Sequence, residues 1–146
     1  MLLAKWTLKF AGEVLLMKTR SMKGPVTEPT DAVRAAQAEI RKEPGVHENY
    51  TVLAGALRAL AQSMRERDPQ RSDELLHLAC AAAWEAKRRS GPGMTSGRTK
   101  QEVKILIAWL RTKNHLGPEA SESLMDQIHS DYLERALDGS DLSHAT

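Results

Sequence analysis

The stretch "LAGALRALAQSMRERDPQRSDELLHLACAAAWEAK", residues 53–87, decides the fold of this chain. In its first half, Leu53, Leu57 and Leu60 recur at helical spacing and form one apolar stripe. Pro69 interrupts this pattern, and an alanine-rich run with a second helical pattern follows it. Helices joined by so short a connection are usually antiparallel neighbours, so the stretch predicts two packed helices.

The sequence on both sides of this stretch shows the same succession of helical patterns and turn residues. Helices are expected within residues 30–45, 47–69, 70–91, 99–117 and 118–139. A chain of 146 residues is long enough to bury a core as one domain. We therefore predict an all-α fold, in which residues 24–139 form a single-domain bundle of five or six antiparallel helices with short loops. Residues 140–146 are expected to be a disordered tail.

Residues 1–23 form a separate basic segment, with five lysines and arginines against one glutamate. An amphipathic helix is preferred, because Trp6 and Phe10 share one face and Lys5 and Lys9 lie beside it. The alternation of apolar and polar residues around Trp6 leaves a short hairpin as the alternative. Charges interrupt every apolar run, so neither a signal peptide nor a membrane span is expected. The apolar face is expected to pack on the domain's own core; docking on a partner or, less favoured, on a membrane surface is the alternative.

The chain contains a single cysteine, Cys80, so no disulfide can form within it. Its alanine-rich surroundings indicate a small buried hydrophobic residue and not a reactive thiol. This cysteine usage favours a reducing compartment, so a cytoplasmic location is expected.

Two carboxylate-x-x-His pairs and two further glutamates follow the chain order of a di-iron helical bundle: Glu48, Glu74 with His77, Glu102, and Asp126 with His129. On a helical wheel, however, His77 belongs to a polar stripe with Glu74 and Glu85. Glu102 is displaced from the level of His77 by roughly 10 Å at 1.5 Å per residue. Glu102 is also expected to form a capping box with Thr99 at the start of its helix. The sequence therefore predicts no metal site and no cofactor.

Catalytic motifs are absent from the sequence as well. The glycine-rich stretch "RRSGPGMTSGRTKQE", residues 88–102, does not match the phosphate-binding loop: Gly93 and Gly97 are too close, and a helix precedes them. No Gly-x-Ser-x-Gly elbow is present, and no strand is expected that could carry one. A non-enzymatic protein is therefore expected.

The near-neutral net charge of +2 hides a strong asymmetry along the chain. Residues 85–115 hold eight basic side chains against two acidic ones, whereas residues 116–146 hold one basic against seven acidic. The simplest interpretation is that the acidic segment packs beside the basic one and satisfies its charges. The alternatives are that the basic residues contact nucleic-acid phosphates, or that the two surfaces recognise a protein partner or another copy.

We predict a non-enzymatic protein-protein interaction or assembly module whose partner is another protein or a second copy of the chain. Nucleic-acid binding through the basic loop 87–104 is the alternative, and a metal-dependent helical-bundle enzyme is a distant third. The residues expected to bind an anion or a partner are Lys87, Arg88, Arg89, Arg98, Thr99, Lys100 and Lys104. The residues expected to dock a partner are Trp6, Phe10, Ile105 and Trp109, the last two because they lie round the helix from its main apolar stripe; the alternative for this pair is packing in a central helix.

Overall fold

The computed structural model describes residues 28–138, in which every regular element is a helix. The helices are α2 (Pro29–Lys42), α3 (His47–Met64), α4 (Pro69–Ser90), α5 (Gly97–Asn114) and α6 (Pro118–Asp138). The predicted all-α class is therefore confirmed, and five helices agree with the predicted number. The predictions for residues 1–23, including Trp6 and Phe10, and for residues 140–146 lie outside the described residues.

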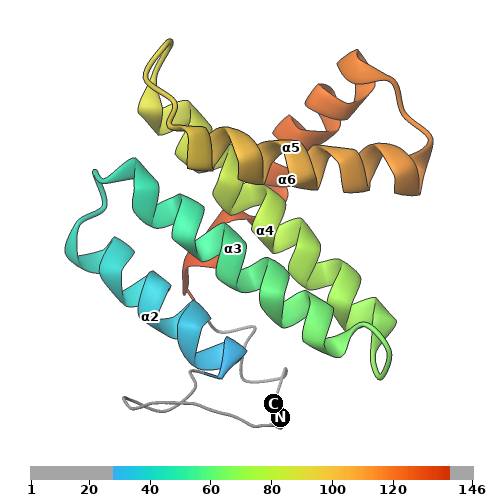
Figure 1. Ribbon diagram of the computed structural model, residues 1–146, viewed down its shortest axis with the longest axis horizontal. Coiled ribbons are helices and arrows are strands. Elements are labelled where there is room, and N and C mark those ends of the chain that lie inside the picture. Colours follow the sequence, from blue (N-terminus) through green and yellow to red (C-terminus); the bar gives the residue numbers. More distant parts are fainter. Residues whose placement is uncertain (1–27, 139–146) are drawn as a thin grey trace, which may run out of the picture.

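Helix α4 is the most deeply buried element of the fold. It packs against α3, α5 and α6, and α3 runs beside it in the opposite direction (Figure 1). The five consecutive residues 79–83 are completely buried, although only one or two sides of a helix usually face a core. Four of them are alanines, whose small side chains let neighbouring helices approach α4 closely.

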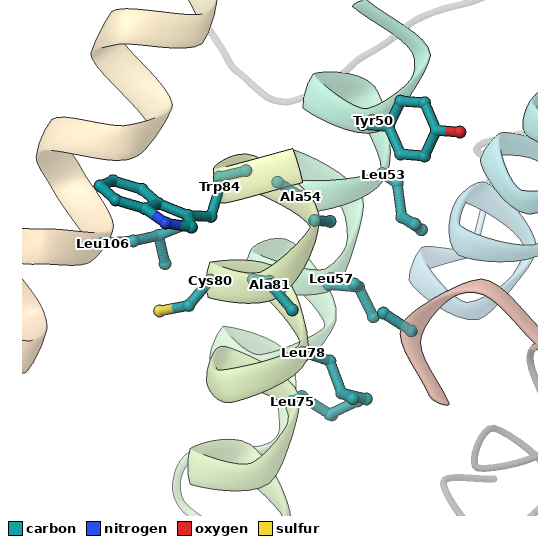
Figure 2. Close-up of a cluster of buried hydrophobic side chains, with 14 of the residues drawn as sticks. Tyr50, Leu53, Ala54, Leu57, Leu75, Leu78, Cys80, Ala81, Trp84 and Leu106 are labelled. Atoms are coloured by element: carbon teal, nitrogen blue, oxygen red, sulfur yellow. The ribbon is translucent and has the colours of Figure 1, made fainter. Parts of the chain in front are cut away.

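The core lies on two sides of the α3–α4 pair, as Figure 2 shows. Leu57 of α3 and Leu78 of α4 point to the side covered by α2 and α6. Cys80 points to the other side, where Trp84 meets Leu106 of α5. All five side chains belong to one buried cluster that joins the five helices.

The two ends of the described chain are joined by a buried hydrogen bond. Gln37 of α2 donates from Nε2 to the backbone oxygen of Ala136 of α6 at 2.8 Å. Helix α5 crosses the end of α4, while α6 returns along α4 behind it (Figure 1). Among the described helices, none is long and apolar enough to cross a membrane.

The polar stripe predicted on α4 faces a neighbouring helix. Ala81, which lies on that stripe, is completely buried. Glu74, His77 and Glu85 are only partly exposed, and each contacts a residue of α6. Helix α6 therefore covers this stripe with polar side chains of its own.

Candidate functional site

The turn between α4 and α5 has a defined conformation. Gly91 and Gly93 have φ angles of 76° and 73°, in the left-handed region that favours glycine. Ser90 Oγ lies 2.8 Å from Thr95 Oγ1, so the end of α4 is bonded to the end of the turn. These contacts bring the last turn of α4 next to the first two turns of α5.

Helix α5 begins at Gly97, two residues before the position expected from the sequence. Ser96 is the N-cap, and its Oγ accepts a hydrogen bond from the Thr99 backbone N–H at 3.2 Å. Thr99 Oγ1 lies 2.8 Å from Thr51 Oγ1 of α3. Glu102 accepts two hydrogen bonds from Arg58 of α3. The predicted capping box between Thr99 and Glu102 is therefore wrong, since both side chains bind α3 instead.

Two adjoining hollows open beside the end of α4 and the turn, one of them bordered by α6 and the other by α5. The larger has a volume of about 430 Å³ and is lined by Trp84, Lys87, Arg88, Gly91, Pro92, Gly93, Thr95 and Asp126. The smaller has a volume of about 200 Å³ and is lined by Lys87, Thr95, Lys100, Val103 and Lys104. Lys87 and Thr95 line both hollows, which are therefore neighbours. We call the four cations that line them, Lys87, Arg88, Lys100 and Lys104, the basic corner.

The side chains of the basic corner are exposed. Within residues 28–138 none of them forms an ion pair, and the ammonium of Lys87 lies 4.3 Å from the centre of the Trp84 ring. One carboxylate of α6, Asp126, lines the larger hollow, and it accepts a hydrogen bond from Trp84 Nε1 at 2.7 Å. The expectation that the acidic segment satisfies the basic one is therefore not met in the described part of the chain.

The other predicted anion-binding residues lie elsewhere. Arg89 is paired with Glu85 and donates to the backbone oxygen of Pro44, on the side of α4 that faces α3. Arg98 is exposed but does not line either hollow. Thr99 is completely buried, so its side chain does not reach a partner at the surface.

The two predicted docking residues of α5 line a third hollow. Ile105 and Trp109 are half-buried, and they border a space of about 180 Å³ between α3, α4 and α5. The Trp109 ring meets the His77 ring edge-on, with 5.4 Å between the ring centres. Trp109 also packs against the core, so a large part of its surface is already covered.

Sequence reasoning missed the polar contacts between α4 and α6. His129 Nε2 lies 2.7 Å from Glu85 Oε1, and Arg135 donates to Glu74 Oε2 at 2.7 Å. Burial raises the pKa of Glu85, but hydrogen bonds from His129 and Arg89 outweigh it and bring the pKa below its usual value. The pKa of Glu74 is lowered mainly by the hydrogen bond from Arg135. In both pairs the acid lies on α4 and the base on α6. For Glu85, which belongs to the basic segment 85–115, this is the reverse of the polarity expected from the segment charges.

A metal centre finds no support in the described residues. No three histidine, cysteine, aspartate or glutamate side chains between residues 28 and 138 are grouped so that they could hold a metal ion. His77 stacks on Tyr132 and His129 pairs with Glu85, so the two histidines have separate partners.

Comparison of the chain with protein-family models, curated proteins and solved structures finds no match.

Proposed function

We propose that the protein is a non-enzymatic interaction module and that its basic corner binds an acidic segment of a protein. The observation that carries the proposal is the hollow surface between α4 and α5, with exposed cations that have no ion pair among the described residues. Unpaired cations around a concave surface attract carboxylates and increase the association rate with an acidic partner.

The floor of the corner favours a peptide segment over a nucleic acid. Val103 and Trp84 form part of this floor, and both are more than nine-tenths buried. A protein segment has apolar side chains that can fill such hollows between its acidic residues. Base stacking requires an accessible aromatic face, and Trp84 leaves little of its ring exposed.

The proposal is tested with fluorescein-labelled poly-L-glutamate and a labelled single-stranded DNA oligonucleotide, by anisotropy at low salt. The corner variant combines Lys87→Gln, Lys100→Gln and Lys104→Gln. Losing three exposed charges is expected to weaken polyglutamate binding about tenfold. The control variant removes as many charges from exposed positions of α2, which lies away from α5 (Figure 1): Arg34→Gln, Arg41→Gln and Lys42→Gln.

Three results would contradict the proposal. An equal loss in the control variant would mean that net charge alone determines binding. Tighter binding of DNA than of polyglutamate would favour the nucleic-acid alternative. Absence of binding to polyglutamate even at low salt would remove the corner as a binding surface for acidic segments.

A further inference from the structure

Helix α6 carries several exposed carboxylates. Its inner face buries Met125 and Ile128 against the rest of the fold. Exposed carboxylates of α6 include Glu119, Glu122, Asp131 and Glu134, and we call these four the acidic face. None of these four forms an ion pair within the described residues; Asp131 accepts hydrogen bonds from Gln127 of the same helix.

Within residues 28–138, no ion pair joins the basic corner to the acidic face. The contacts that hold α6 on α4 are made by other side chains of α6, Asp126, His129 and Arg135. The positions are complementary in spacing: Lys100 and Lys104 are one turn apart on α5, and Glu119 and Glu122 are about one turn apart on α6. A net charge of only +2 also leaves little overall repulsion between two copies.

This inference rests on the function proposed above. We propose that the partner is a second copy of this chain and that its acidic face on α6 binds the basic corner. The corner and the acidic face are different surfaces, so the contact is heterologous and each copy offers one of each. Copies joined in this way associate head to tail and form either a closed ring or an open chain. Exposed ion pairs are weak and screened by salt, so assembly is expected to depend on protein concentration and to be lost at high ionic strength.

The test uses the full chain and two variants, each lacking one surface. The corner variant retains its acidic face. The face variant, Glu119→Gln with Glu122→Gln and Glu134→Gln, retains its basic corner. In sedimentation velocity at low salt, the wild type is expected to show a mass that rises with concentration. Each variant alone is expected to remain a monomer, and an equimolar mixture is expected to form a species of one copy of each and nothing larger.

Matched controls separate this contact from a general effect of charge. The α2 variant described above is the control for lost cations. Glu39→Gln with Glu43→Gln and Glu48→Gln is the control for lost carboxylates, because these three side chains are exposed on other helices or their ends. Both control variants are expected to assemble as the wild type does.

Two outcomes would overturn the inference. One is a wild type that stays monomeric at every concentration at low salt. The other is assembly that persists in both surface variants, which would place the contact on another part of the molecule. The failure of the inference is distinguishable from failure of the proposed function. The distinguishing result is a wild type that is monomeric and still binds labelled polyglutamate through Lys87, Lys100 and Lys104. That result would support the proposed function and contradict only the second copy as the partner.

Discussion

Arg58 of α3 holds Glu102 of α5 in a two-pronged ion pair, with Nε to Oε2 at 2.6 Å and Nη2 to Oε1 at 3.2 Å. The Glu102 carboxylate is the more buried partner, with 10% of its side chain exposed against 27% for Arg58. The hydrogen bond to Glu102 raises the pKa of Arg58 above its usual value. This pair fixes the first half of α5 against α3 and thereby positions Lys100 and Lys104 of the basic corner.

Glu102→Ala is expected to lower the free energy of unfolding by about 2–4 kcal/mol, because it leaves the Arg58 guanidinium partly buried without its counter-ion. The measurement is urea unfolding followed by circular dichroism. Glu119→Ala removes an exposed carboxylate from α6 and is expected to change stability by less than about 0.5 kcal/mol. Equal effects of the two substitutions would show that the buried pair contributes nothing beyond surface charge.

The start of α5 gives a second prediction. Ser96→Ala removes the hydroxyl that caps the helix and is expected to cost about 1 kcal/mol, whereas Ser96→Gly costs only a few tenths. Thr99→Val keeps the shape of the side chain but leaves the buried Thr51 hydroxyl without its partner, at an expected cost of about 1–3 kcal/mol. Both costs are measured by urea unfolding. If Thr99→Val leaves the free energy of unfolding unchanged, the Thr51 hydroxyl finds another hydrogen-bond partner.

The helices themselves could be predicted from local patterns, but their polar contacts could not. Apolar spacing and the proline and glycine boundaries indicate each helix of the described chain. At the start of α5 the sequence predicts a capping box at Thr99, whereas Ser96 caps the helix and Thr99 binds Thr51, which lies 48 residues away in the sequence. A helical wheel shows that Glu85 is polar, but it does not show whether solvent or another helix faces it. Contacts of this kind depend on the packing of distant segments and leave no local signal.

The pairs between α4 and α6 predict a particular sensitivity to acid. The pKa values of Glu74 and Glu85 are lower in the folded state, so both pairs stabilise the fold above the unfolded pKa of about 4.3. This stabilisation is lost as the pH falls through the lowered folded-state pKa values. Urea unfolding between about pH 6 and pH 2 is therefore expected to show a smaller loss of stability for Glu85→Gln than for the wild type.

A matched control for the acid prediction is Glu122→Gln on the exposed side of α6. It is expected to retain the pH dependence of the wild type, because it removes no contact between helices. If Glu85→Gln and Glu122→Gln lose stability with pH in the same way as the wild type, the pair of Glu85 and His129 does not stabilise the folded protein.

The thiol of Cys80 is expected to be unreactive in the folded protein. Its side chain is completely buried, and burial raises its pKa well above the usual value, so little thiolate forms at neutral pH. Dithionitrobenzoate should therefore modify Cys80 of the native protein only as fast as the chain opens. In urea above the unfolding midpoint, the thiol should react as fast as a free thiol in solution. Destabilising substitutions such as Glu102→Ala are expected to accelerate the native reaction in proportion to the open population. Rapid and complete modification of Cys80 in the native wild type would contradict both the burial of this side chain and the packing of α5 over this side of α4.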